Sequence, residues 1–163
     1  MLASLSCYNG SLTQLRVEFA GPRGFSEAHM YIITKAFHFS YGHRLIDYDG
    51  KCRFLHGHNG ILEVDIQSDN LDHRGMVMDF SDLSRMIKKW LDEHIDHKMV
   101  LAKGDPLVNT LLEIGEPLYL VEENPTAENL ARHICQQTRA LGIAVSEIRL
   151  WETPSSYATY RAQ

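Results

Sequence analysis

The sequence predicts an α+β domain built on an antiparallel sheet. Three observations carry this prediction: alternating apolar residues indicate two strands early in the chain, two amphipathic helix patterns occupy its middle, and two further strand patterns close it. The resulting order is strand, strand, helix, helix, strand, strand. Because the helices are segregated between two hairpin-like strand pairs, an α+β domain is predicted.

The size and composition of the chain fit one globular domain. Its 163 residues can bury one hydrophobic core and are too few for two ordinary domains. The formal net charge of -5 argues against a general nucleic-acid binder. No apolar run is long enough to cross a bilayer, and the first ten residues lack a secretory-signal pattern. Because the cysteines are few and scattered, a cytoplasmic location is expected.

The first thirty residues are predicted to be an N-terminal extension, residues 1–30, with the domain over residues 31–163. Leu15, Val17 and Phe19 alternate with polar residues and indicate a short strand. The run from Gly21 to Gly24 contains a proline and two glycines and would end that strand.

Two long strands are predicted on either side of a turn at residues 48–50. In the first, which begins near Tyr31, one face carries four apolar residues: Ile33, Phe37, Phe39 and Tyr41. His43 has the same parity and ends this apolar face. In the second, the inward face is marked by three apolar residues: Leu62, Val64 and Ile66.

Two amphipathic helices are predicted in the second half. Asp79 is placed to cap a helix that ends near Asp96 and His97. Its apolar stripe has the spacing of one buried face: Leu83, Ile87, Trp90, Leu91 and His94. Thr126 is placed to cap the second helix, and Gly142 to end it.

The remaining elements are shorter. Asp105 and Pro106 indicate a short helix through Leu111, and residues 118–121 are expected to be extended. Residues 148–152 and 157–161 are the two closing strands. Because an antiparallel sheet has two open edges that other copies of the chain could close, we expect a homo-oligomer.

A metal site is predicted where the two long strands meet. His56 and His58 are two residues apart, so their side chains leave a strand on the same face, and Gly57 between them has no side chain. His43 offers a third imidazole. Three neutral imidazoles suit zinc, and a catalytic zinc site typically has three protein ligands with a fourth position open.

Cys52 lies four residues before His56 and has more than one interpretation. It can be a small buried apolar residue or a fourth ligand that closes a structural zinc site. It can also be a base or nucleophile, because nearby zinc, Lys51 and Arg53 would favour the thiolate and lower its pKa. The sequence leaves these alternatives open.

Two further sets of polar residues are candidates for chemistry. Asp96 and His97 are adjacent, so they can be a solvated helix end or, if the carboxylate orients the imidazole, a proton shuttle. Glu152 occupies the apolar face of its strand and needs a partner. That partner would be either a ligand with paired N–H donors or a buried arginine.

The chain resembles the 6-pyruvoyl-tetrahydropterin synthase and 6-carboxytetrahydropterin synthase family over roughly residues 31–161. Several motifs in the same order carry the resemblance: Phe39 to Leu45 with His43, Cys52 to His58, Met78-Asp79-Phe80, Asp96-His97, Pro125-Thr126-Ala127-Glu128-Asn129 and Glu152. It implies the tunnelling fold (T-fold), in which trimers close an antiparallel barrel, two trimers stack into a hexamer, and active sites lie between subunits.

The resemblance also implies roles for individual residues. The zinc ligands would be His43, His56 and His58. Cys52 would abstract a proton, with Asp96 and His97 of a neighbouring subunit as its partners. Glu152 would anchor the pterin, and Thr126 and Glu128 would line the pterin pocket.

The implied substrate is 7,8-dihydroneopterin triphosphate. Three residues separate Cys52 from His56, which is similar to the bacterial branch that yields 6-carboxytetrahydropterin and acetaldehyde for queuosine synthesis. The alternatives are a 6-pyruvoyl-tetrahydropterin synthase and a non-catalytic pterin-binding protein with a structural zinc. The sequence departs from the family pattern at Tyr41 and Gly42, where small residues are usual, and at Gly60, where an aromatic residue is common.

Overall fold

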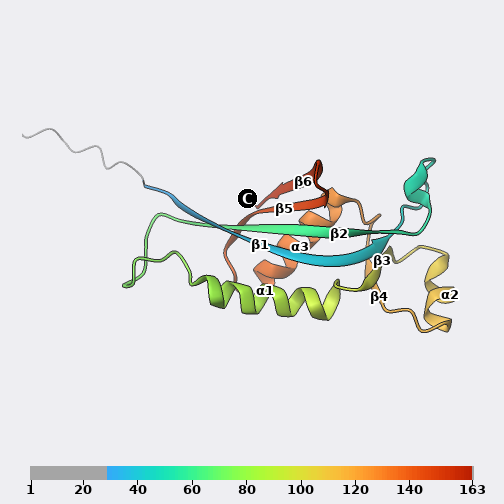
Figure 1. Cartoon of the computed structure of the whole chain (residues 1–163), viewed down its shortest axis with the longest axis horizontal. Coiled ribbons are helices and arrows are strands. Elements are labelled where there is room, and N and C mark those ends of the chain that lie inside the picture. The colour runs from blue at the N-terminus through green and yellow to red at the C-terminus, as the bar shows by residue number, and fades with distance from the viewer. Residues whose placement is uncertain (1–28, 163) are drawn as a thin grey trace, which may run out of the picture.

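A six-stranded sheet organises the structure, a computed structural model that describes residues 29–162 (Figure 1). The predicted strand over residues 15–19, and nearly all of the predicted extension, lie outside the described residues. The strands are β1 (Tyr31–His43), β2 (His56–Ser68), β3 (Lys98–Ala102), β4 (Leu118–Val121), β5 (Val145–Thr153) and β6 (Ser156–Arg161).

The strand order is β4-β3-β1-β2-β5-β6. β1 and β2 form a long antiparallel hairpin that runs the length of the molecule, with Tyr31 opposite Ser68 and His43 opposite His56 (Figure 1). β5 and β6 continue the antiparallel pairing, as predicted. The predicted antiparallel sheet is thus present in four strands, and two further strands extend it with parallel pairing: β3 pairs with β1, and β4 pairs with β3.

β3 is the strand that the sequence pattern did not reveal. Its sequence, Lys-Met-Val-Leu-Ala, ends in three consecutive buried residues, so it shows no alternation. A strand covered on both faces is expected to have such a continuous apolar run. Val100 packs into the main hydrophobic core and Leu101 packs in a second cluster with Val108 and Leu111, so both faces of this short strand are covered.

The helices are α1 (Phe80–His94), α2 (Leu107–Glu113) and α3 (Ala127–Ala140). Both predicted caps are confirmed: Asp79 accepts a hydrogen bond from the Ser81 N–H, and Thr126 accepts one from the Asn129 N–H. Within residues 29–162, no helix is both long and apolar enough to span a bilayer.

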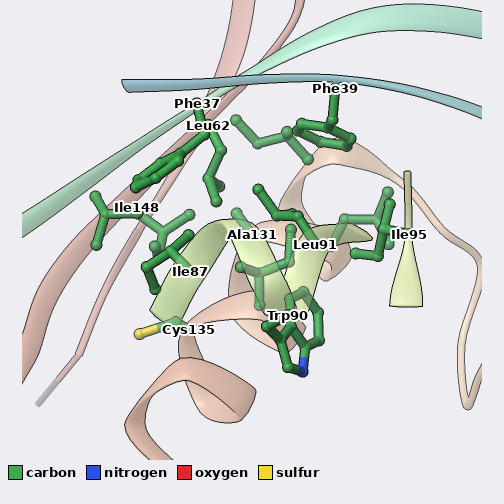
Figure 2. Close-up of a cluster of buried hydrophobic side chains, with 14 of the residues drawn as sticks. Phe37, Phe39, Leu62, Ile87, Trp90, Leu91, Ile95, Ala131, Cys135 and Ile148 are labelled. Atoms are coloured by element: carbon green, nitrogen blue, oxygen red, sulfur yellow. The ribbon is translucent and has the colours of Figure 1, made fainter. Parts of the chain in front are cut away.

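One hydrophobic core joins α1 and α3 to a single face of the sheet. Figure 2 shows Ile87 of α1 and Ala131 of α3 among the residues packed with Phe37 and Leu62. Phe37, Phe39 and Tyr41 are all buried, as their alternation predicts. The opposite face of the sheet carries charged side chains, so the two faces differ as expected of a half-solvated sheet.

Candidate metal and catalytic site

Three histidines converge at the end of the β1–β2 hairpin that adjoins its connecting loop. His43 pairs with His56 across the hairpin, and Tyr41 pairs with His58, so the three imidazoles lie on one face. Their ligand nitrogens all lie within 4.8 Å of one another. The sequence prediction that these side chains come together is confirmed.

Two of the imidazoles are oriented by backbone carbonyls. His43 Nδ1 lies 2.8 Å from the Pro125 oxygen, and His56 Nδ1 lies 2.8 Å from the Phe54 oxygen. A carbonyl only accepts hydrogen bonds, so each Nδ1 carries the proton and each Nε2 keeps its lone pair. Burial lowers the pKa of His43 despite the opposing effects of the Pro125 carbonyl and Glu152, which favours the neutral ligand form.

The group has the geometry to hold a metal ion. Nε2 of His43 lies 3.1 Å from Nε2 of His58. A tetrahedral ion such as zinc, bound at the usual zinc–nitrogen distance, would separate two such nitrogens by about 3.3 Å. Among residues 29–162, the group consists of the three histidines and does not include Cys52. The donor set therefore fits an ion with an open fourth position.

Cys52 lies half-buried on a short 3-10 turn, Lys51–Arg53, in the connection between β1 and β2. Its carbonyl oxygen accepts a hydrogen bond of 2.9 Å from the Leu45 N–H. The same connection is held at Ile46, whose N–H and C=O both bond to the side-chain amide of Asn124 at 2.8 Å. The segment that carries Cys52 is thus fastened to the chain just before Pro125.

Glu152 of β5 reaches the histidine group and has a tyrosine as its partner. Its Oε1 accepts a hydrogen bond of 3.2 Å from the Tyr41 hydroxyl and lies 3.8 Å from His43 Nε2. Burial, and then the charge of Glu152, raise the pKa of Tyr41, so the phenol stays protonated. The sequence analysis did not identify Tyr41 as a residue of this site. Its position on the same strand face as His43 was the signal that could have indicated it.

The departures at Tyr41 and Gly60 are parts of one packing arrangement. A Cβ added at Gly60 would lie 3.1 Å from the Phe39 ring and 3.2 Å from the Tyr41 ring. The two rings stack with centroids 5.4 Å apart. The space that a side chain at residue 60 would need is therefore already filled from β1.

Asp96 and His97 face each other although they are adjacent. His97 has a positive φ of 56°, and its Nδ1 lies 3.0 Å from Asp96 Oδ1. This left-handed conformation, which adjacent residues of a regular helix or strand lack, brings the two side chains together. Asp96 Oδ1 also accepts the Ser40 N–H at 2.9 Å. Although partial burial opposes it, these bonds lower the pKa of Asp96.

The His97 side chain is 80 % exposed and lines a hollow of about 520 Å³, whose other lining residues include Ser40, Asn59, His56 and His58. Ser40 has the opposite parity to His43 on β1, so its side chain points to the other face of the sheet. Within residues 29–162, no hydrogen bond or ion pair joins Asp96 or His97 to Cys52 or to the three histidines. The single chain thus brings Glu152 to the histidines, whereas it gives Asp96 and His97 no hydrogen bond to them.

The remaining predicted residues lie at the start of α3. Thr126 caps the helix, and the preceding Pro125 supplies the carbonyl that orients His43. Glu128 is exposed in the first turn. The segment therefore adjoins the histidine group through Pro125.

The chain is similar to known pterin enzymes over most of its length. The family model described as 6-pyruvoyl tetrahydropterin synthase matches residues 32–163. A protein of Rickettsia bellii named 6-carboxy-5,6,7,8-tetrahydropterin synthase is 37% identical over 131 residues, which cover 76% of this chain and 95% of the relative. A protein of the same name from Haemophilus influenzae is 34% identical, covering 81% of this chain and 99% of the relative.

Solved structures show the same fold. An uncharacterized protein from Wolinella succinogenes matches with a TM-score of 0.74 and 29% identity, covering 83% of this chain and all of that chain (100%). The 6-pyruvoyl tetrahydropterin synthase of Caenorhabditis elegans matches with a TM-score of 0.64 and 22% identity, covering 83% of this chain and 97% of that chain. The sheet and helices described above are therefore those of the T-fold.

Proposed function

Because the chain belongs to the 6-pyruvoyl tetrahydropterin synthase family, we propose that it is a zinc-dependent lyase of the 6-carboxytetrahydropterin type. It converts 7,8-dihydroneopterin triphosphate and water into 6-carboxy-5,6,7,8-tetrahydropterin, acetaldehyde and triphosphate, a step toward queuosine and other 7-deazaguanines. The observation that carries the proposal is the trio of histidines beside Glu152. The relatives named for the carboxy product, and the short spacing between Cys52 and His56, support this product.

The histidine group and Glu152 bind different parts of the substrate. His43, His56 and His58 hold zinc, which when bound acts as a Lewis acid on the side-chain oxygens and makes the neighbouring carbon-bound hydrogens more acidic. Glu152 accepts two N–H groups of the pterin ring in a bidentate hydrogen bond. Thr126 and Glu128 line the pterin pocket.

Cys52, Asp96 and His97 move protons. Cys52 removes a proton from the side chain of the substrate, and His97, oriented by Asp96 Oδ1 at 3.0 Å, returns one. Asp96 and His97 serve the site of a neighbouring subunit, a role supported by the lack of any hydrogen bond from the pair to the histidine group within the described part of one chain. The exposure of His97 supports this arrangement.

The proposed assembly is a homohexamer, a dimer of trimers in which the sheets close into a barrel. The outer strands β4 and β6 each leave an edge that a second copy can cover. The pterin synthase domain spans residues 31–163, close to the range that the family model matches. The sparse cysteines support action in the cytoplasm.

The test is product identification. Zinc-loaded protein is incubated with 7,8-dihydroneopterin triphosphate, and products are identified by mass spectrometry beside a metal-free control. A carboxypterin with acetaldehyde, formed only with metal, is the expected result. A pyruvoyl pterin would replace the proposed product, and unchanged substrate would contradict the enzyme assignment in favour of a pterin-binding protein. Light scattering measures the subunit number.

A further inference from the structure

The Tyr41 ring is fixed in the wall of the histidine site. The residue is 3% exposed. Its ring stacks on Phe39 and packs edge-on against His43, with centroids 5.2 Å apart. It also packs at a tilt against His58, with centroids 5.7 Å apart. A ring held on three sides presents its hydroxyl at one position. That hydroxyl donates to Glu152 Oε1 at 3.2 Å.

Glu152 is close enough to the histidine group to compete for the metal. Its Oε1 lies 3.8 Å from His43 Nε2, the nitrogen whose lone pair the Pro125 contact leaves available. Carboxylate oxygens are good zinc ligands, and one small rotation of a glutamate side chain moves its oxygens by more than an ångström. A carboxylate that turned toward the ion would fill the open fourth position and would no longer face a substrate.

We propose that Tyr41 is a positioning residue that holds Glu152 off the metal and keeps its carboxylate facing the pterin. The tyrosine hydrogen bond occupies a lone pair of Oε1, the oxygen nearest the histidines, and fixes the side-chain rotamer. The inference rests on the proposed function, because it takes Glu152 as the pterin anchor and the histidines as zinc ligands. Tyr41 acts through Glu152 and needs no contact with the substrate.

The first test uses cobalt in place of zinc, since its visible absorption reports the ligands around the ion. Tyr41→Phe removes only the hydroxyl, and we expect its cobalt bands to differ from those of the unmodified protein. The double variant Tyr41→Phe/Glu152→Gln should restore the original bands, because an amide is a poor zinc-type ligand. Tyr119→Phe, which removes another hydrogen-bonded hydroxyl far along the chain, is the matched control and should leave the bands unchanged.

The second test measures binding of 7,8-dihydroneopterin to the metal-free protein by fluorescence. Because Tyr41→Phe removes the hydrogen bond that fixes the Glu152 carboxylate, we expect this variant to raise the dissociation constant about tenfold. Tyr119→Phe should leave the dissociation constant unchanged. Unchanged cobalt bands, altered bands that persist in the double variant, or an unchanged dissociation constant would each overturn the role of Tyr41.

The two proposals fail in different ways. If the unmodified protein forms no carboxypterin while the cobalt bands and binding behave as expected, only the proposed reaction is wrong. If carboxypterin forms normally while Tyr41→Phe matches the unmodified protein in both tests, only the role of Tyr41 is wrong.

Discussion

Arg44 and Asp105 form a bidentate ion pair, with Nε to Oδ2 and Nη2 to Oδ1 both 2.7 Å apart. The Asp105 side chain is fully buried, and its Oδ1 also accepts the Leu107 N–H at 2.8 Å. The pair thus fastens the residue after His43 to the start of α2. Paired geometry of this kind is the strong form of a charged hydrogen bond.

Removing this carboxylate is expected to destabilise the fold. Asp105→Ala leaves the largely buried Arg44 guanidinium without its partner, so the free energy of unfolding should fall by about 3 kcal/mol. Chemical denaturation measures the change. The control is Asp92→Ala, which breaks an exposed pair with Lys88 at 3.0 Å and should cost less than about 0.5 kcal/mol. Equal losses in the two variants would contradict the prediction.

Metal binding should depend on the three converging histidines and not on other histidines of the chain. Replacing His43, His56 or His58 with alanine should reduce bound zinc from about one ion per chain to nearly none. His38→Ala is the matched control, because His38 is an exposed histidine on the opposite face of β1. Elemental analysis after dialysis measures the zinc. Retention by the site variants, or loss in the control, would argue against this site.

Cys52→Ala should slow turnover strongly while leaving the zinc in place. Loss of a residue that transfers protons typically slows a reaction by about 100- to 10,000-fold. Steady-state kinetics and metal analysis of the same sample separate the two effects. Cys135→Ala changes a thiol in the hydrophobic core (Figure 2) and should keep kcat while lowering stability by about 1 kcal/mol. Loss of zinc from Cys52→Ala would instead indicate a fourth ligand.

His133 should make stability depend on pH. Burial, and then the charges of Arg132 and His94, lower the pKa of His133, and its Nε2 lies 2.7 Å from the Tyr119 hydroxyl. The unfolded chain, with a histidine pKa of about 6.5, then binds more protons than the folded chain as the pH falls below that value. This contribution to stability is therefore complete above about pH 6.5 and is lost on acidification.

The measurement is urea denaturation at pH 7.5 and at pH 5.5, two values about one unit to either side of the unfolded histidine pKa. The unmodified protein should lose more stability over this interval than His133→Gln does. His73→Gln removes an exposed histidine and should behave like the unmodified protein. A loss of stability as large in His133→Gln as in the unmodified protein would exclude this residue as a source of the pH dependence.

The features that sequence predicted well depend on local geometry. The alternation of a strand places His43 on the same face as Tyr41, and the same rule unites His56 with His58. The helix caps at Asp79 and Thr126 follow from side-chain bonds to backbone groups two or three residues away. Such relations need no knowledge of the rest of the fold.

The features that sequence did not reveal depend on distant or unusual backbone geometry. Tyr41 meets Glu152 because β2 brings β1 and β5 into one sheet, a neighbourhood that neither residue shows by itself. Asp96 faces His97 because His97 has a positive φ. The pattern of apolar and polar residues in the sequence does not predict this backbone conformation. The catalytic roles of Cys52, Asp96 and His97 stay predictions.

The β1–β2 hairpin also bears on the order in which the site assembles. Its strands are neighbours in sequence, so their pairing closes only the short loop of residues 44–55, whereas β5 must join from much farther along the chain. Local contacts of this kind have the lower loop-closure cost and form early in folding. The three imidazoles are therefore expected to meet while the rest of the chain is still unfolded, with Glu152 arriving last. A nascent chain could capture its metal before it has a pocket to receive a substrate.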